Sequence, residues 1–466
     1  MVPPTSPDGG GRPAGSFEPI KRSIACDWSP SQVALALRDR RHPFALVGSW
    51  FGGGAIIGSD PSVVLDPTSG QDPFEVLDTV ERSATQTSPD TGGAVFGGWV
   101  GYLGYQAGRL VERLPGSPPR PHPLPDWWLG WYDHLLRFDP DTGWWFEALA
   151  APDRMRTIEA AHQRIIDQLS GDPPMPRDVQ LEPFSPTPTG DDHRKAVRRT
   201  LELIAAGDIY QANVCLRLSA RRSMGEPLDV FVAGLERLAP GYAAHVELGA
   251  SRAITSLSPE RFLTRLGDLV TTSPIKGTRR RDPNLGDDDP ARQELGQSIK
   301  DRAENVMIVD LMRNDLGRVC VPGSIHVPRL FDTEAHPGLW HLVSEVTGRL
   351  RDDVGDGDVL RATFPPGSVT GAPKVRAMEV IAEVEATGRE VYTGSIGMVS
   401  PVAGAEWNVA IRTFEHSGGH TWLGAGGGIV ADSDPEAELV EAMTKASPLV
   451  EALGSSIETG SLRRDV

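Results

Sequence analysis

The sequence predicts an α+β fold, in which strands and helices occur in separate runs rather than in alternation. Two observations support this prediction. Short strand-like segments rich in glycine and aromatic residues follow one another through 43–150, with turn signals between them. Longer helix-like segments at 155–170, 291–317 and 433–453 stand apart from such runs. The 466 residues are enough for one large domain or two to three ordinary ones.

The N-terminal third is predicted to consist mainly of strands. A short helix at 29–40 precedes strand regions at 43–67 and 92–108. The segment 127–150 is predicted to form two strands joined by a turn at Asp139-Pro140-Asp141, because these are turn-forming residues. Such short strands with turns between them indicate antiparallel sheets.

A proline-rich polar segment divides the chain. We predict a linker at 171–190, between an N-terminal region at 18–170 and a C-terminal region at 191–453. The segment 1–17 is predicted to be a disordered tail, and 454–466 a second tail.

The C-terminal region mixes helices with successive strands. A helix at 191–208 with an Asp N-cap comes first, and 291–317 is predicted to be one long helix. Several strands in succession, a meander, are predicted for 245–278. The remaining predicted elements are strands at 209–220, 391–400, 407–416 and 420–430, and helices at 371–388 and 433–453.

Composition limits the function. The net charge is −17, which argues against general nucleic-acid binding and against binding to an anionic membrane surface. No apolar run approaches the roughly 20 residues that span a bilayer. The start of the chain has no apolar signal segment, and three widely spaced cysteines fit a reducing compartment. We therefore expect a cytoplasmic protein.

Lys276 lies in the stretch TTSPIKGTRRRDP, just before Arg279, Arg280 and Arg281. Neighbouring positive charge and burial both disfavour a protonated amine, so this setting would suit a nucleophilic lysine. The alternative is a solvated basic loop after a strand. The stretch by itself favours the loop.

Two pairs of acidic residues have helical spacing. Asp301 and Glu304 are three residues apart on one predicted helix, and Glu438 and Glu441 are three apart on another. Facing pairs would suit Mg²⁺, which takes few carboxylates together with water and an anionic ligand. The alternative is two solvated acidic faces. Lys445, four residues after Glu441, would then form a simple ion pair along its helix.

Several strings occur one after another between roughly Asp191 and Ala446. They are GDIYQANVCLR, SLSPERF, PIKGTRRR, DRAENVMIVDLMRNDLGRV, HLVSEVTG, GSVTGAPKVRAMEVI, YTGSIG, NVAIRT and GAGGGIVADSDPEAELVEAMTKA. In this order they resemble the chorismate-utilising enzymes, a family that includes the anthranilate synthase large subunit, aminodeoxychorismate synthase component I, and the isochorismate and salicylate synthases. The resemblance implies a large antiparallel-sheet sandwich flanked by helices.

Two positions indicate the branch of the family. Members that add water carry a lysine where this chain has Gln211, and anthranilate synthases usually have alanine where it has Lys276. The chain therefore resembles aminodeoxychorismate synthase component I most. Formation of anthranilate or of 2-amino-2-deoxyisochorismate is the alternative.

The resemblance implies that Lys276 attacks C2 of chorismate while Glu260 protonates the leaving C4 hydroxyl, and that ammonia then displaces the lysine. It implies Mg²⁺ held directly by Glu304 and Glu441, and through water by Asp301 and Glu438. It also implies a set of substrate-binding residues, which are Thr278, His341, Tyr392, Arg412, Gly427, Gly428 and Lys445.

The resemblance also implies a partner. No GxCxGxQ-type element surrounds any of the three cysteines, so ammonia is expected from a separate glutamine amidotransferase subunit. An alternative of another class is a catalytically silent subunit that only binds such a partner.

Overall fold

The structure is a computed structural model that describes residues 17–80, 93–116, 118–121, 123–282, 284, 286, 289–336 and 339–458. The predicted N-terminal tail lies outside the described residues except for Phe17, and the predicted C-terminal tail is described only to Glu458.

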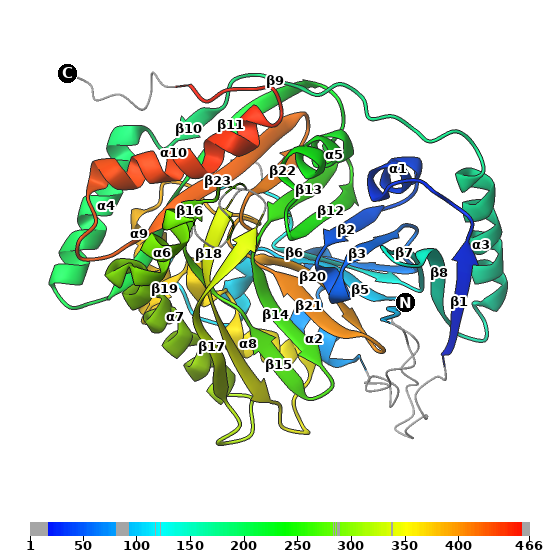
Figure 1. The fold of residues 1–466 in the computed structure, drawn as a ribbon, viewed down its shortest axis with the longest axis horizontal. Coiled ribbons are helices and arrows are strands. Elements are labelled where there is room, and N and C mark those ends of the chain that lie inside the picture. Colours follow the sequence, from blue (N-terminus) through cyan, green and yellow to red (C-terminus); the bar gives the residue numbers. More distant parts are fainter. Residues whose placement is uncertain are drawn as a thin grey trace.

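Two large sheets with antiparallel pairing dominate the described chain (Figure 1). The first runs in the order β1 (Glu18–Ile24), β8 (Gly143–Ala150), β7 (His134–Asp139), β3 (Gly54–Gly58), β2 (Phe44–Gly48), β12 (Tyr242–Gly249), β13 (Arg252–Ser258), β22 (Thr413–Ser417), β23 (His420–Ile429), β11 (Gln211–Met224) and β10 (Ser185–Thr187). Two short strands, β9 (Gln180–Leu181) and β19 (Gly371–Ala372), also pair with β11.

The second sheet runs in the order β16 (Ile275–Arg280), β18 (Leu339–Arg349), β15 (Leu269–Thr272), β14 (Arg261–Leu266), β21 (Gly404–Asn408), β20 (Ser395–Ser400), β5 (Gly98–Leu103), β6 (Trp127–Tyr132) and β4 (Val63–Leu65). An additional strand, β17 (His326–His336), pairs with β18.

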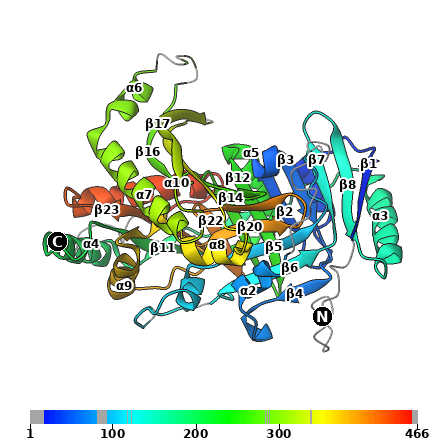
Figure 2. The same ribbon diagram turned by 90° about the horizontal axis from the view of Figure 1, so that it is seen from below.

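Helices flank the sheets. They are α1 (Pro30–Ala36), α2 (Pro73–Asp78), α3 (Met155–Leu169), α4 (Gly190–Ala205), α5 (Pro227–Leu238), α6 (Pro290–Gln297), α7 (Ile299–Gly317), α8 (Asp356–Thr363), α9 (Lys374–Val384) and α10 (Pro435–Glu451). Short 3-10 turns are η1 (Trp50–Gly52), η2 (Pro67–Ser69), η5 (Tyr105–Leu110) and η7 (Gly367–Val369). Figure 1 shows α10 lying across β23 beside α4, and Figure 2 shows α7 running next to α8.

The core is layered, as strand β2 illustrates. Phe44 and Leu46 pack into the cluster between the two sheets, while Ala45 packs into the cluster beneath the helices of the first sheet. Successive side chains of a strand point to opposite faces, so a strand covered on both faces is apolar throughout. Helices α2, α7 and α8 cover the outer face of the second sheet. The α+β prediction and the antiparallel sandwich are confirmed.

The regions 18–170 and 191–453 share both sheets. Strand β2 pairs with β12 in the first sheet, and β5 pairs with β20 in the second. The predicted linker supplies β9 and β10, and Ile457 in the predicted C-terminal tail forms a bridge with Phe184. The strands of the predicted linker and the residues around Ile457 are therefore parts of the sandwich, while the domain boundaries themselves stay a prediction.

The segment 127–150 forms three strands instead of the two predicted. The chain leaves the second sheet after β6 and enters the first sheet with β7, and Asp133 lies between them. Its buried carboxylate accepts from His134 Nδ1 at 2.7 Å and from Arg154 Nε at 2.9 Å. The break is fixed by these long-range contacts, which is why no turn signal marks it.

The predicted meander at 245–278 is also wrong in one respect. Strand β13 belongs to the first sheet and β14 to the second, so the chain crosses between sheets at Pro259 and Glu260. A similar crossing joins β21 to β22 and ends at Arg412. Both crossings bear on the site described below.

Two helix predictions need correction. The long helix predicted at 291–317 is broken at Ser298, whose backbone is extended. The Ser298 hydroxyl caps α7 by accepting a hydrogen bond from the Asp301 amide. The helix predicted from 191 begins at Gly190, and its N-cap is Thr189 rather than an aspartate. Both corrections follow from hydroxyl residues, which satisfy the free amides of a first turn.

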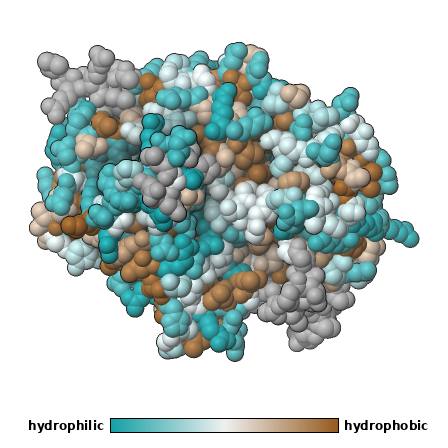
Figure 3. Space-filling model, in the orientation of Figure 1, coloured by the Kyte–Doolittle hydropathy of each residue, from teal (hydrophilic) through white to brown (hydrophobic). Residues whose placement is uncertain are grey.

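The surface carries both apolar and polar side chains. Figure 3 shows separate hydrophobic patches among hydrophilic residues on the face seen in Figure 1. Within the part of the chain that the structure describes, no helix is both long and apolar enough to cross a membrane.

Candidate active site

The two sheet crossings lie together and hold each other. Val409 donates its amide to the carbonyl of Glu260 at 3.0 Å, and Leu257 donates to the carbonyl of Arg412 at 2.9 Å. The Ser258 hydroxyl donates to the Val409 carbonyl at 2.7 Å. Glu260 and Arg412 are thereby fixed at the place where the sheets separate.

Glu260 is buried, with 5% of its surface exposed. Its Oε1 accepts a hydrogen bond from Ser368 Oγ at 2.7 Å. Burial raises the pKa of this carboxyl above its usual value, although the Ser368 hydrogen bond and the positive charges of Lys276 and Arg412 oppose the change. A carboxyl with a raised pKa holds its proton to higher pH than an exposed glutamate does, which suits a proton donor.

Lys276 lies on β16, next to Glu260. Its Nζ donates to the backbone carbonyl of Ser368 at 2.9 Å. Burial lowers the pKa of the amine, and the carboxylates of Glu304 and Glu260 partly restore it. Burial disfavours the ammonium form because a charge loses its hydration, so the neutral, nucleophilic amine becomes more accessible.

Two of the three arginines that follow Lys276 are engaged elsewhere, and none of the three is among the main causes of its lowered pKa. Arg279 Nη2 forms an ion pair with Asp301 at 3.1 Å, and Arg281 lies over the Trp340 ring at 5.2 Å. The cation among those causes is Lys445, on α10. Alternation of side chains along a strand separates sequence neighbours in this way.

A β-bulge lies directly after Lys276. Ile275 pairs with Val343 and Thr278 with His341, so β16 has one extra residue between these pairs. Gly277 has φ +83°, which is the left-handed region that glycine adopts readily. Such bulges redirect side chains and occur next to active sites. The pairing also brings the predicted ring-contacting residues Thr278 and His341 side by side.

His341 is buried and electrically neutral. Its ring stacks on His336 with centroids 4.5 Å apart. Burial, together with the charges of His336 and Arg412, lowers the pKa of His341 to about 3. Neither ring nitrogen has a hydrogen-bond partner among the described residues. The ring can therefore contact a substrate without adding a charge.

Arg412 presents a positive charge to the same region. Its backbone has φ +51°, an uncommon value for a residue other than glycine and one that clusters at functional sites. Its guanidinium makes no hydrogen bond or ion pair with a described residue, although it interacts electrostatically with Glu260. A guanidinium without a protein partner suits a substrate carboxylate.

The glycine strand β23 forms another wall. A Cβ at Gly427 would lie 3.0 Å from Glu438 Oε2 and 3.5 Å from Glu441 Oε1, so its missing side chain leaves room for these carboxylates. A Cβ at Gly428 would collide with the side-chain amide of Gln211. The two glycines thus let α10 and Gln211 approach the strand closely.

Tyr392 is buried against the paired strands β11 and β23. Its ring covers Gly424, and its backbone amide donates to Glu415 Oε1 at 3.0 Å. Its hydroxyl forms a hydrogen bond with Cys215, and burial raises the pKa of the phenol well above its usual value. The phenol therefore stays protonated.

The acidic residues on α7 and α10 are close enough for their charges to interact, as Glu304 and Glu441 do. Glu304 is half-buried, and burial raises the pKa of its carboxyl while Lys276 and Lys300 oppose the change. It makes no hydrogen bond or ion pair with any described residue. Lys445 Nζ donates to the Gly426 carbonyl at 3.0 Å and pairs with Glu441 at 2.7 Å.

The donor chemistry fits a hard divalent cation. Among the described residues, no three His, Cys, Asp or Glu side chains converge into a ligand set. Asp301 is paired with Arg279, and Ser433 donates to Glu438 at 2.7 Å. Mg²⁺ needs only one or two carboxylates when water and substrate supply the rest, and the unpartnered Glu304 carboxylate meets that need.

Sequence reasoning missed Ser368, in η7. Its hydroxyl contacts Glu260 and its carbonyl contacts Lys276. The string GSVTGAPKVRAMEVI belongs to the family resemblance but gives no sign of these contacts, one of which is made by the backbone. Lys300, which faces Glu304, Glu438 and Glu441, was also missed.

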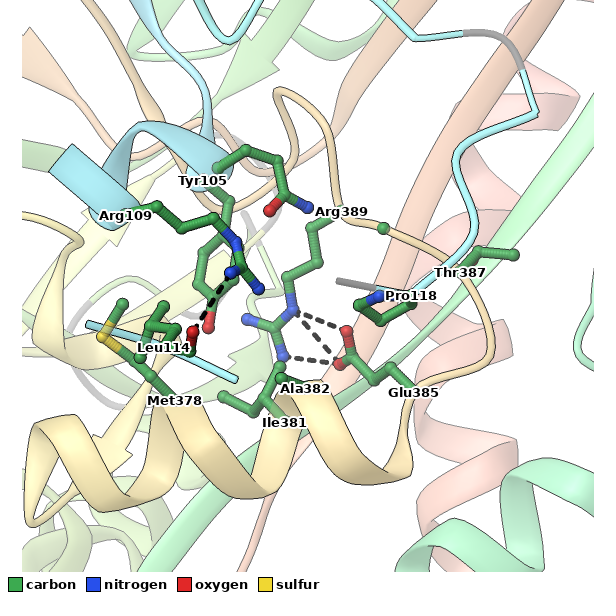
Figure 4. A pocket seen from close by; sticks show the side chains of 12 residues that line it. Tyr105, Arg109, Leu114, Pro118, Met378, Ile381, Ala382, Glu385, Thr387 and Arg389 are labelled. Carbon is green, nitrogen blue, oxygen red and sulfur yellow. Dashed lines mark hydrogen bonds and ion pairs between the residues drawn. The ribbon is translucent and has the colours of Figure 1, made fainter. Parts of the chain in front are cut away.

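A pocket whose lining includes none of Lys276, Glu260 and Ser368 is drawn in Figure 4. Tyr105 and Arg109 come from η5, and Met378, Ile381 and Ala382 from α9. The remaining lining residues are Gln106, Leu114, Pro118, Glu385, Thr387, Gly388 and Arg389.

Arg389 is the buried centre of this pocket. It pairs with Glu385 at 2.6 Å, and its other donors reach the carbonyls of Asn213 at 2.6 Å and Val369 at 2.9 Å. Its guanidinium also lies over the Tyr105 ring at 4.7 Å. The side chain thus ties α9, β11 and η7 together.

Replacing Arg389 with methionine should lower the free energy of unfolding by about 3–5 kcal/mol, because Glu385 would be left as a buried charge without its partner. Urea denaturation of both proteins measures the difference. The matched control is Arg199→Met, which removes an exposed ion pair to Glu383 on the same helix α9 and should have little effect. Equal effects of the two substitutions would contradict this role for Arg389.

Comparisons with known proteins agree with this arrangement. The family model described as chorismate binding enzyme matches residues 36–451. The chain is 39% identical over 397 residues to aminodeoxychorismate synthase component 1 of Salmonella typhimurium, covering 82% of each protein. It is 37% identical to anthranilate synthase component 1 of Streptomyces coelicolor, covering 84% of this chain and 79% of that protein.

A solved structure shares the whole fold. Anthranilate synthase component I of Streptococcus pneumoniae superposes with a TM-score of 0.71 at 26% identity, covering 97% of this chain and 93% of that one. The matched range 36–451 of the family model includes both crossings and the residues around Lys276. The chain belongs to the family of chorismate-binding enzymes.

Proposed function

We propose that the protein converts chorismate and ammonia into 4-amino-4-deoxychorismate through a covalent adduct on Lys276. The observation that carries this proposal is that one residue, Ser368, forms hydrogen bonds with both the lysine amine and the Glu260 carboxyl. Similarity to relatives named aminodeoxychorismate synthase component 1 supports the choice of product. Anthranilate formation is the second candidate, because a relative of that name is 37% identical.

The chemistry divides into two displacements. The neutral Lys276 amine forms a bond to C2 of chorismate while the C4 hydroxyl leaves as water, using a proton from Glu260. Ammonia then bonds to C4, the bond from C2 to the lysine nitrogen breaks, and the Glu260 carboxylate takes a proton from the incoming nitrogen. The lowered pKa of Lys276 and the raised pKa of Glu260 both favour the forms that this sequence of steps needs.

We assign the orientation of the substrate to charged and polar side chains around the site. Arg412 would bind a carboxylate through its fork of donors, and the neutral His341 would contact the ring with Thr278 beside it. Tyr392, Lys445 and the strand carrying Gly427 and Gly428 form the opposite wall. These assignments follow the family resemblance.

We also assign Mg²⁺ to this site. Glu304 and Glu441 would hold the ion directly, with Asp301 and Glu438 bonded through water. When bound, the ion supplies positive charge that orients and neutralises the ring carboxylate of the substrate. Among the protein's own side chains, Lys300 and Lys445 offset part of the negative charge of Glu304 and Glu441.

A separate glutamine amidotransferase subunit is the proposed source of ammonia. The relatives are named as component 1, which supports a multi-component enzyme. The three cysteines are free, which fits the reducing conditions of the cytoplasm that we propose as its location.

Product identification tests the function. The protein is incubated with chorismate, Mg²⁺ and ammonium, and the products are separated and identified by mass spectrometry. Aminodeoxychorismate is expected without the amidotransferase, and glutamine should replace ammonium once that subunit is added. Anthranilate as the product would favour the second candidate, and absence of turnover would revive the interpretation of a silent binding subunit.

Replacing Gln211 with lysine should yield a trace of isochorismate. Gln211 lies against Gly428, and its Oε1 is buried without a partner among the described residues. A lysine there would place an amine able to activate water in the site. Chromatography of the products measures the change, and Gln211→Met is the control that should give none. Isochorismate from the unmodified protein would contradict the assigned family branch.

A further inference from the structure

We propose that Ser368 is a positioning residue that confines the acidic proton of Glu260 to its Oε2 atom while holding the Lys276 amine beside it. This inference rests on the proposed function, because it assigns Glu260 the role of acid. It concerns a residue that touches the acid and the nucleophile and is not itself a reacting group.

The two contacts of Ser368 use different groups. Its hydroxyl donates to Glu260 Oε1 at 2.7 Å, and its backbone carbonyl accepts from Lys276 Nζ at 2.9 Å. An oxygen that accepts the hydroxyl proton is disfavoured as the site of the carboxyl's own proton. The neutral acid therefore carries its proton on Oε2, and the acid and the amine are kept at one fixed separation.

The two residues after Ser368 are held by hydrogen bonds from Arg389 and Asn213. Arg389 Nη1 donates to the Val369 carbonyl at 2.9 Å, and Asn213 Nδ2 donates to the same atom at 3.2 Å. The Asn213 amide donates to the Thr370 carbonyl at 2.7 Å. Arg389, which lines the pocket of Figure 4, therefore supports the turn that carries Ser368. A residue fixed in this way can position others.

The hydroxyl also acts on the ionisation of Glu260. The groups that face this carboxyl are Lys276 on β16, Arg412 before β22, the Ile275 amide and the Ser368 hydroxyl. Each favours the carboxylate, whereas burial favours the acid. Removing the hydroxyl takes away one of these opposing contributions, so the pKa of Glu260 must rise and the acid must persist to higher pH.

Three variants separate positioning from simple structural support. Ser368→Ala removes the hydroxyl but keeps the backbone carbonyl that contacts Lys276. Ser368→Thr keeps a hydroxyl. The matched control is Ser258→Ala, because Ser258 Oγ accepts from the Glu260 amide at 3.2 Å and does not bond to its carboxyl.

The first measurement needs no turnover. Infrared difference titration, with Glu260→Gln as the reference, follows the Glu260 carboxyl band against pH in the free protein. Ser368→Ala should move its midpoint upward by about half a pH unit or more, since one hydrogen bond to the charged form is lost. Ser368→Thr and Ser258→Ala should leave the midpoint near that of the unmodified protein.

The second measurement is the rate of chorismate consumption against pH. Because the acid must be protonated, the rate falls as pH rises through the pKa of Glu260, and Ser368→Ala should shift this decline to higher pH. At its optimum kcat should fall by about 10- to 100-fold with little change in KM, and threonine should restore most of it.

The outcomes are distinguishable. An unshifted infrared midpoint in a folded Ser368→Ala protein would overturn the inference, whatever the product of the enzyme. An equal shift in Ser258→Ala would reduce Ser368 to a structural residue. A shifted midpoint together with a product other than aminodeoxychorismate would keep the positioning role and reject the proposed function.

Discussion

Replacing Lys276 with alanine is expected to reduce aminodeoxychorismate formation by a factor on the order of 10³ or more, the scale of loss that removing a nucleophile produces. The variant keeps β16, the Gly277 bulge and the Glu260–Ser368 contact, so the rest of the site stays in place. The emptied space beside C2 would admit ammonia directly, and a low yield of 2-amino product or anthranilate is expected. Product analysis by mass spectrometry measures both effects.

Stability is the control for that result. Alanine removes the hydrogen bond from Nζ to the Ser368 carbonyl, worth about 1 kcal/mol, but it also removes a buried amine whose charged form is poorly hydrated. The free energy of unfolding should therefore change by less than about 2 kcal/mol. A stably folded Lys276→Ala protein that makes aminodeoxychorismate at a near-normal rate would show that the lysine is only an electrostatic anchor.

Replacing Glu304 with alanine should reduce activity by about 10²- to 10³-fold, because the site loses the carboxylate that makes no hydrogen bond or ion pair with a described residue. Glu441→Ala should have a similar effect. Excess Mg²⁺ should rescue either variant only weakly, since the ion must also contact the substrate. Steady-state rates over a range of Mg²⁺ concentrations measure the loss.

Two acids on the same helix provide controls for Glu304. Asp301→Ala should have a milder effect, because that carboxylate is assigned to the ion through water and not directly. Asp310→Ala removes an exposed carboxylate that pairs only locally with Arg313 and should leave the Mg²⁺ dependence unchanged. An unchanged Mg²⁺ dependence in both the Glu304 and Glu441 variants would remove these residues from the metal site.

The sequence predicted the antiparallel sandwich and the identity of the candidate site residues, but it did not predict how those residues are brought together. Periodicity and turn residues indicated antiparallel strands, and the strings around Lys276 and Glu260 indicated the family. The crossing at Pro259 and Glu260 was missed because a strand that changes sheets leaves the same local pattern as a strand that turns back. That crossing is what places the Glu260 carboxyl against Ser368 and Lys276.

The cause of the lowered pKa of Lys276 also required the structure. The sequence places three arginines beside Lys276, but strand geometry and the bulge at Gly277 send Arg279 to Asp301 and leave Lys276 in a different environment. Burial, which depends on segments far away in the chain, lowers the pKa instead. The carbonyl of Ser368 has no sequence signal because every residue has a carbonyl.

The sequence does contain a signal for the start of helix α7. Ser298 is a good N-cap residue, and Gly296 just before it weakens a helix, so a break could be predicted there. The break places Asp301 in the first turn of α7 beside Gly277. The acidic pair on this helix is therefore set by a cap as well as by helical spacing.

The covalent adduct tests the central claim most directly. Protein is mixed with chorismate without ammonia, quenched in acid, digested and analysed by mass spectrometry. The expected result is a peptide containing Lys276 whose mass has increased by that of chorismate minus water, with no such peptide from Lys276→Ala. Absence of this adduct from an unmodified protein that makes aminodeoxychorismate when ammonia is added would contradict the covalent mechanism.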